Sequence, residues 1–159
     1  MKEKNRIIVD TLSVPNQPKA IDGTLDSDVF SLSPTDRIRC VAPLVYSLRA
    51  SFVGDGYLLE GEVSTVINCN CDRCLKDYEI KVVVPDVCHF YEGVTERQLD
   101  VTDDVREDVV INFPEKCLCS DECLGICPQC GKNLNEEPCD CPDSQKKQGT
   151  WDGLDKLEL

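Results

Sequence analysis

Apolar and polar residues alternate along residues 44–53, a pattern typical of a strand with one face against a core. The more apolar positions are Leu44, Tyr46, Leu48, Ala50 and Phe52. Gly54-Asp55-Gly56 follows and tolerates the positive φ angles of a hairpin turn. The pattern therefore predicts a hairpin whose return strand runs from about Tyr57 to Cys69, with a bulge or a close backbone approach at Gly61.

Two more strands are expected after this hairpin, at Glu79–Val84 and Val87–Tyr91, with Pro85 separating them. The connections are too short for crossover helices, so the sheet is expected to be antiparallel. Before the hairpin, the chain predicts a short strand at Arg6–Asp10 and then a proline-rich loop over residues 11–36.

Valines recur at a helical spacing after an acidic loop at residues 92–100. They are Val101, Val105 and Val109. This spacing predicts one helix over about 101–112, which Pro114 ends.

Together these elements predict an α+β fold that is mainly β. We expect an antiparallel sheet or partly open barrel with one helix and a small C-terminal cysteine-rich zinc module. The expected parts are an N-terminal strand and loop segment (1–39), a β-rich core (40–116), the cysteine-rich module (117–142) and a C-terminal tail (143–159). Trp151 and Leu154 in the tail suggest a short amphipathic segment that docks on the body.

The chain has 12 cysteines, and the expected compartment decides how to interpret them. The first residues lack the apolar run of a secretory signal, and no window approaches the length of a membrane span. We therefore expect a cytoplasmic protein without membrane contact, in which cysteine pairs indicate metal before disulfide.

Cys127-Pro-Gln-Cys130-Gly131 places two thiolates in a tight turn, and Cys139-Asp-Cys141 follows it. A turn through Asn133-Leu-Asn135 would bring the second pair back to the first. Four thiolates form a closed tetrahedral zinc site, which leaves no open position for catalysis.

Four further cysteines raise the number of candidate ligands to eight, which is enough for two sites. They are Cys119 and Cys123, which would share a face if that piece were helical, and Cys71 and Cys74. The cofactor is expected to be one or two structural zinc ions. Chain order leaves open which cysteines share an ion, including a site shared between the pair at 71 and 74 and the C-terminal group.

A redox pair and an iron–sulfur cluster are the competing uses of these thiols. Acidic residues beside Cys71 and Cys74 disfavour a reactive thiolate. Cys40 and Cys88 lie in the stretch predicted to form the β-sheet (40–91) and are expected to be buried, whereas Cys69 and Cys117 stay unassigned. Arg73 is expected either to pair with Asp72 or Asp77 or to contact a partner.

No catalytic residue is predicted. His89, the only histidine, is expected to be structural, and the chain lacks the common phosphate-loop, serine-hydrolase and zinc-protease motifs. The net charge of −13 argues against DNA or bare RNA as a direct ligand. It fits either a basic protein surface as partner or an acidic surface that serves solubility alone.

The order of these motifs resembles the bacterial YceD family of large ribosomal RNA subunit accumulation proteins, which has a plastid branch. The residues that carry the resemblance span roughly 40–141. They are Cys71-Asp-Arg-Cys74-Leu75, Phe113-Pro114, Cys119, the run Cys123-Leu-Gly-Ile-Cys127-Pro-Gln-Cys130-Gly-Lys-Asn133-Leu-Asn135, and Cys139-Asp-Cys141.

The resemblance implies a non-enzymatic role in accumulating or processing 23S rRNA for the large ribosomal subunit. The implied partners are a ribosomal protein, an rRNA precursor or an assembly intermediate. The alternatives are a zinc-stapled adaptor unrelated to ribosomes and a thiol redox protein.

Overall fold

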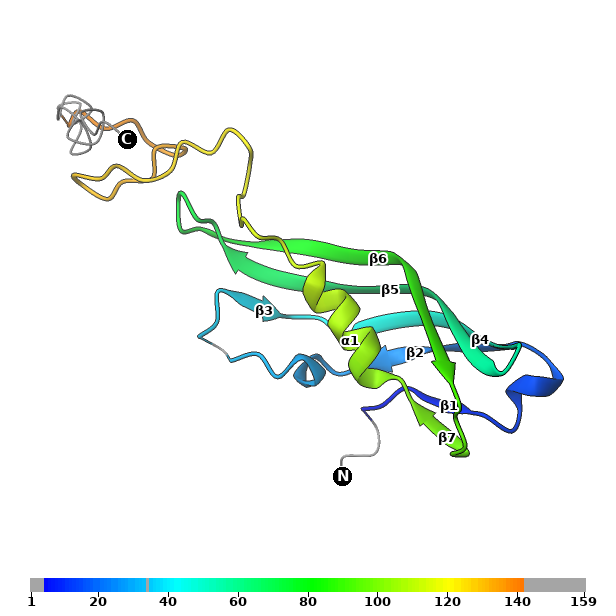
Figure 1. Cartoon of the computed structure of the whole chain (residues 1–159). Coiled ribbons are helices and arrows are strands. Elements are labelled where there is room, and N and C mark those ends of the chain that lie inside the picture. The colour runs from blue at the N-terminus through cyan, green and yellow to red at the C-terminus, as the bar shows by residue number, and fades with distance from the viewer. Residues whose placement is uncertain (1–4, 34, 142–159) are drawn as a thin grey trace, which may run out of the picture.

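The fold is an open antiparallel sheet with one helix, seen in a computed structural model that describes residues 5–33 and 35–141. The strands described are β1 (Ile8–Asp10), β2 (Lys19–Leu25), β3 (Ile38–Cys40), β4 (Leu44–Val53), β5 (Gly56–Asn70), β6 (Asp77–Glu92) and β7 (Gln98–Asp100). The helix α1 (Thr102–Ile111) lies across the sheet, and the cysteine-rich segment that follows the helix extends beyond one end of the sheet (Figure 1). The predicted fold class, mainly antiparallel β with one helix, is confirmed.

The long strand β5 organises the main sheet. Its first part pairs with β4, its last part pairs with β3, and β6 runs along its other side. β2 extends the sheet beyond β4, and β1 and β7 form a separate two-stranded ribbon. Every pairing described is antiparallel, and the short connections between β4, β5 and β6 require this for those strands. The division of the chain into four parts stays a prediction.

The two strands predicted on either side of Pro85 are one strand, so that prediction is wrong. Between Val63 and Gly61, β5 advances two residues while β6 advances three, from Val84 to Val87. The extra residue is a bulge. Among the described residues β6 pairs only with β5, so the missing N–H of proline removes no bond to a second neighbouring strand there. The irregularity expected at Gly61 is confirmed.

The bulge also changes which residues of β6 face the core. Val84 and Val87 are both buried, although a regular strand would place them on opposite faces. Beyond the bulge, His89 and Tyr91 therefore point to the inner side and Cys88 points outward. The expectation of a buried Cys88 is wrong for this reason: its side chain is exposed.

Four regular elements lie in stretches that were predicted to be loops. β2 and two short 3₁₀ turns, Val14–Asn16 and Ser27–Phe30, occupy most of residues 11–36. β7 lies within the supposed acidic loop at 92–100. β2 is largely exposed and β7 has three residues, so neither carries the apolar pattern that identifies a strand.

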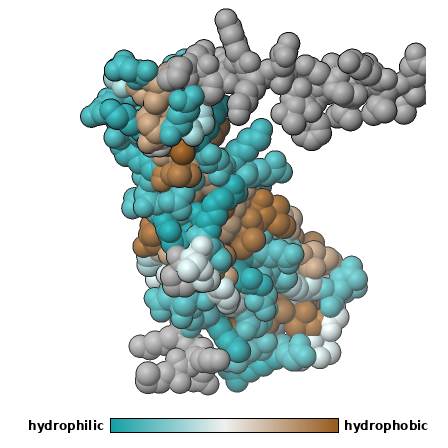
Figure 2. All heavy atoms as spheres, turned by 90° about the vertical axis from the view of Figure 1, so that its left-hand side faces the viewer, coloured by the Kyte–Doolittle hydropathy of each residue, from teal (hydrophilic) through white to brown (hydrophobic). Residues whose placement is uncertain are grey.

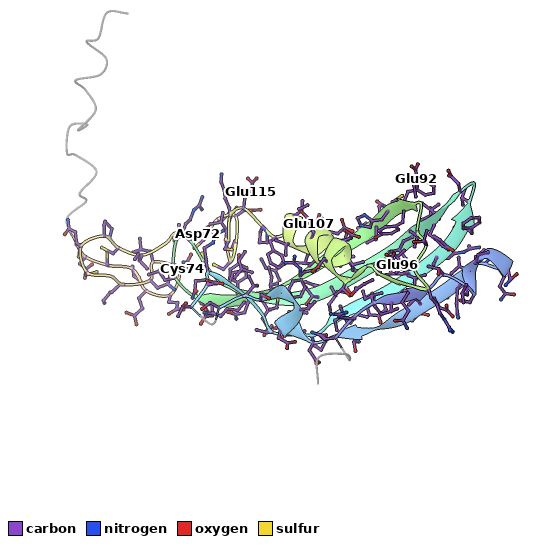
Figure 3. All side chains as sticks on the ribbon, turned by 60° about the horizontal axis from the view of Figure 1, so that its bottom comes forward. Asp72, Cys74, Glu92, Glu96, Glu107 and Glu115 are labelled. Atoms are coloured by element: carbon purple, nitrogen blue, oxygen red, sulfur yellow. The ribbon has the colours of Figure 1, made fainter. Side chains whose placement is uncertain are left out.

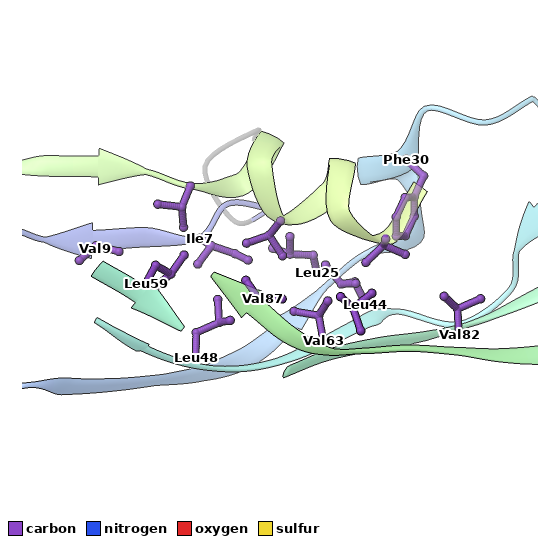
Figure 4. Packing of buried hydrophobic residues seen from close by; sticks show 14 of the residues in the cluster. Ile7, Val9, Leu25, Phe30, Leu44, Leu48, Leu59, Val63, Val82 and Val87 are labelled. Atoms are coloured by element: carbon purple, nitrogen blue, oxygen red, sulfur yellow. The ribbon is translucent and has the colours of Figure 1, made fainter. Parts of the chain in front are cut away.

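The core lies between the sheet and a layer formed by α1, β1 and the segment around Phe30 (Figure 4). The valines that predicted the helix are all buried, with none of their surface exposed, and they are Val101, Val105 and Val109. Two hydrogen bonds fix α1 above the end of β6. Tyr91 Oη donates to Asp104 Oδ2 at 2.6 Å, and His89 Nε2 lies 2.7 Å from Asp108 Oδ2. The structural role expected of His89 agrees with this contact.

Candidate metal centre

Two turns of the same backbone geometry carry the two Cys-x-x-Cys pairs. We call residues 71–76, which connect β5 to β6, the hairpin turn, and residues 127–132 the C-terminal turn. In the hairpin turn, Cys71 N donates to Lys76 O at 2.9 Å. In the C-terminal turn, Cys127 N donates to Lys132 O at 2.8 Å. Each turn aims backbone N–H groups at the sulfur of its first cysteine.

Eight cysteines gather into two groups of four around these turns. The first cysteine group is Cys71, Cys74, Cys119 and Cys123, and the second cysteine group is Cys127, Cys130, Cys139 and Cys141. Within each group all sulfur atoms lie within 4.8 Å of one another. In the first group, Cys71 Sγ lies 3.8 Å from Cys123 Sγ, and Cys74 Sγ lies 3.6 Å from Cys119 Sγ. Sulfurs around a tetrahedral zinc at ~2.3 Å are about 3.8 Å apart, so this spacing fits such an ion.

The first cysteine group joins the sheet to the C-terminal segment, because half of its members come from each (Figure 3, where Asp72 and Cys74 lie at this end of the sheet). Asp72 positions the second half: its carboxylate accepts from Cys117 N at 2.8 Å, and its own N–H donates to Cys117 O at 2.7 Å. Arg37 contacts Asp72 at 3.1 Å and donates to Glu115 O at 3.1 Å. The sequence suggested Asp72 only as an ion-pair partner of Arg73 and gave no role to Arg37, because no local spacing identifies these contacts.

The second cysteine group is local in the chain and more exposed than the first. Ile126 and Asn133 form an antiparallel bridge, and Leu134 N donates to Gly125 O at 2.9 Å. This fold returns Cys139 and Cys141 to the C-terminal turn, as the Asn133-Leu-Asn135 run predicts. The helix considered for the stretch from Cys119 to Cys123 is absent, because these residues form turns and irregular backbone.

The electrostatics of the first cysteine group favour a bound cation. Burial raises the pKa of the Cys71 thiol, but N–H groups of Cys119, Cys74 and Arg73 outweigh burial and lower it to about 6. The hydrogen bond between Cys119 and Cys74 raises the pKa of Cys119 to about 12. Some sulfurs therefore keep their protons because further thiolates would repel one another, and a divalent ion would displace these protons.

The second cysteine group repeats this pattern. Backbone N–H groups of Cys130 and Gln129 lower the pKa of Cys127 to about 6. The hydrogen bond with Cys130 raises the pKa of Cys141 to about 12. The pKa of Cys123 in the first group is also lowered, because N–H groups of Gly125 and Asn135 outweigh its burial. Each group thus contains thiols of lowered pKa beside thiols of raised pKa, and each can hold a metal ion.

The remaining cysteines lie outside both groups. Cys69 and Cys117 are completely buried and belong to the apolar core. Cys40, expected to be buried, is half-buried. Burial nevertheless raises its pKa to about 11.

Arg73 does not form the ion pair that the sequence suggests. Its Nη1 donates to the carbonyls of Asp121 and Cys123, both at 3.0 Å. Asp72 pairs instead with Arg37, and Asp77 pairs with Arg39. Arg73 therefore ties the hairpin turn to the loop that carries Cys123, and its contact with a partner stays a prediction.

No helix in the described part of the chain is long and apolar enough to cross a membrane. The expected docking of the tail at Trp151 and Leu154 lies outside the described residues.

Comparison with known proteins supports the family resemblance. The model of the family described as large ribosomal RNA subunit accumulation protein YceD matches residues 89–158. This match confirms the predicted resemblance and covers six of the eight grouped cysteines, although it starts later than residue 40 and extends beyond residue 141.

Curated relatives come from mycobacteria. An uncharacterized protein of Mycobacterium bovis and one of Mycobacterium tuberculosis H37Rv are each 28% identical to the chain over 112 residues. The alignment covers 61% of this chain and 54% of each relative, so the chain spans about half the length of the relatives it matches. No solved structure matches the chain.

Proposed function

We propose that this chain, which its match over residues 89–158 links to the YceD family, is a non-catalytic factor in the accumulation of 23S rRNA. It would act in the production of the large ribosomal subunit as a zinc-stapled binding module. The single observation that carries this proposal is the family match, whose description names accumulation of the large ribosomal RNA subunit.

The two cysteine groups support a structural role for zinc. Four sulfurs within 4.8 Å of one another make a complete ligand set, so a zinc ion there has no open position for substrate. The C-terminal segment also offers few buried apolar side chains: from residue 118 to residue 141, the buried hydrophobic residues are Cys123 and Cys127. A segment with so little core needs a staple to fold.

The surface around the cysteine groups supports a basic partner. Acidic side chains in this segment are Asp121, Glu122, Glu136, Glu137 and Asp140. Two zinc ions on eight thiolates would add about −4 to their charge. Leu124 and Ile126 are exposed among them, and the view from this end shows mainly hydrophilic surface interrupted by apolar patches (Figure 2). A basic segment of a ribosomal protein, or an assembly intermediate that displays one, has the complementary charge.

Depletion of the protein in its host tests this function. We expect the ratio of 23S to 16S rRNA to fall and to recover when the wild-type chain is restored. A chain with Cys127→Ser should restore the ratio less well, whereas Cys88→Ser, which alters an exposed cysteine outside both groups, should restore it fully. An unchanged ratio on depletion would contradict the ribosomal role.

Affinity capture of the full chain separates this function from that of an unrelated adaptor. We expect ribosomal proteins or rRNA among the captured molecules, and their binding should weaken as salt screens the acidic surface. Recovery of one stable, non-ribosomal partner in their place would favour the adaptor.

A further inference from the structure

Asn135 belongs to the loop of the second cysteine group, yet its side chain contacts the first cysteine group. It lies between Cys130 and Cys139 in the chain. Its Nδ2 donates to Cys123 Sγ at 3.3 Å, and its Oδ1 accepts from Leu124 N at 2.8 Å. One amide thus holds both the sulfur of a first-group cysteine and the backbone immediately after it.

The position of Asn135 depends on its own loop. Asn133 Oδ1 accepts from Asn135 N at 3.0 Å and from Asn135 Nδ2 at 2.7 Å, which fixes the orientation of the amide. Asn133 is in turn held by its bridge to Ile126, directly before the C-terminal turn. The loop leaves the second cysteine group at Cys130 and returns to it at Cys139.

We propose that Asn135 couples the two cysteine groups, so that a metal ion in the second group strengthens metal binding in the first. The inference rests on the proposed metal binding. An ion held by Cys130 and Cys139 closes the loop and removes much of the entropy cost of ordering Asn135. The ordered amide then stabilises the Cys123 thiolate, because a hydrogen bond to a ligand atom supports the ligand's charge and direction.

Two further contacts link the first cysteine group to the segment of the second. Ile126 N donates to Arg73 O in the hairpin turn at 3.1 Å, so the start of the C-terminal turn is attached to the first group. Lys76 Nζ lies 3.5 Å from Glu136 Oε1 on the loop itself. This ion pair is exposed and contributes little, so the coupling is assigned to the buried end of the network at Cys123.

Thermodynamics makes the coupling reciprocal. If an ion in the second group raises the affinity of the first by some factor, an ion in the first raises the affinity of the second by the same factor. Couplings between sites are commonly about 5- to 150-fold, and loss of a group that supports a metal ligand commonly costs about 10- to 100-fold in affinity. We expect a factor of about ten.

Two double variants of the full chain isolate the sites. Cys139→Ser with Cys141→Ser leaves the first cysteine group complete, and Cys71→Ser with Cys74→Ser leaves the second complete. Each metal-free protein is titrated with Co²⁺ in competition with a chromophoric chelator, and tetrahedral thiolate absorption bands report binding. Each isolated group should bind about tenfold more weakly than the same group in the wild-type chain, by equal factors.

Asn135→Asp and Asn135→Ala assign the coupling to this residue. The aspartate keeps an acceptor for Leu124 N but loses the donor to Cys123, and the alanine loses both. In each variant the first group should bind about tenfold more weakly, and removal of the second group should then cause little further loss. Glu137→Gln, an exposed change in the same loop, should leave both affinities at their wild-type values.

The titrations distinguish failure of the coupling from failure of metal binding itself. Two ions bound with affinities that are independent of each other, or unchanged by Asn135→Asp, would overturn the coupling while leaving the proposed metal binding intact. A wild-type chain that binds no thiophilic metal would overturn both.

Discussion

Leu75 and Gly131 occupy the same place in the two cysteine turns, and both have a positive φ, 62° and 74° respectively. Each follows the second cysteine of its pair. Leu75 N donates to Cys71 O at 2.9 Å, and Gly131 N donates to Cys127 O at 2.8 Å. Glycine adopts this backbone freely, whereas for leucine it costs about 1–2 kcal/mol. The hairpin turn therefore carries a strain that the C-terminal turn avoids.

Leu75→Gly should relieve this strain. The Leu75 side chain is 62% exposed, so its removal costs little packing, and the greater freedom of glycine in the unfolded chain offsets part of the gain. We expect the free energy of unfolding to rise by about 0.5 kcal/mol, measured by urea denaturation of the metal-loaded protein. Gly131→Ala should have the opposite sign, with a loss of about 1 kcal/mol. Destabilisation by Leu75→Gly would show that leucine contributes a contact that outweighs the strain.

Cys127→Ser should remove one metal ion and leave the other. The two cysteine groups share no ligand, and the sheet has its own apolar core. Native mass spectrometry of the zinc-loaded protein should detect one ion in this variant and two in Cys88→Ser. Circular dichroism should show that the sheet is retained. Loss of both ions together with the sheet would indicate that the groups form one folding unit.

Arg73→Ala should loosen the loop that carries Cys123. Nη1 of the guanidinium donates to two carbonyls of that loop, and a lysine ammonium, on a more flexible stem and less pre-organised, should hold them less firmly. Hydrogen exchange at residues 121–126 should therefore accelerate in Arg73→Ala and, to a smaller extent, in Arg73→Lys. Arg97→Ala, which removes an exposed arginine far from this loop, should leave the exchange unchanged. Loss of partner binding with unchanged exchange would instead assign Arg73 to the partner surface.

Neighbouring valines on α1 provide a matched test of the core. Val109 is completely buried, whereas Val110 is 38% exposed. Val109→Ala removes two buried methyl groups and should cost about 2 kcal/mol of the free energy of unfolding. Val110→Ala should change it by less than about 0.5 kcal/mol, because alanine's better helix propensity compensates for the smaller loss of burial. Equal effects in urea denaturation would contradict the placement of α1.

Stability should fall at alkaline pH, partly because of Cys40. Burial raises the pKa of this thiol from 9.0 to about 11 in the folded chain. Between these values the unfolded chain has released the proton and the folded chain retains it, so unfolding becomes more favourable as pH rises. The contribution is complete below pH 9 and lost as the pH rises through 11. Urea denaturation across this range should show a shallower decline in Cys40→Ala than in the wild type, whereas Cys88→Ala should follow the wild type.

Much of the fold could be predicted because its signals are local. The β4–β5 hairpin follows from ten alternating residues and a glycine turn, and α1 follows from three valines at helical spacing. The cysteines of the second group gather as expected because their spacing and the intervening asparagines lie in one short stretch.

The remaining features depend on long-range contacts. Cys71 and Cys74 join Cys119 and Cys123 because Asp72 and Arg37 hold the intervening segment against the hairpin turn. No local pattern encodes that contact. The continuity of β6 through Pro85 could not be predicted for a related reason. Proline suggests the end of a strand, and only the pairing with β5 shows that the strand continues and that the bulge reverses which of its residues face the core.

The ribbon of β1 and β7 has a consequence for the order in which the protein is completed during synthesis. Ile7 N donates to Thr102 Oγ1, 95 residues further along the chain. At about 5–20 residues per second, β1 is synthesised roughly 5–20 s before its partner strand β7. The β4–β5 hairpin needs no such delay, since both of its strands emerge together. A strand made late in synthesis therefore pairs with one made at its start. A nascent protein stalled before residue 98 would leave β1 without the β7 strand that it pairs with in the finished fold.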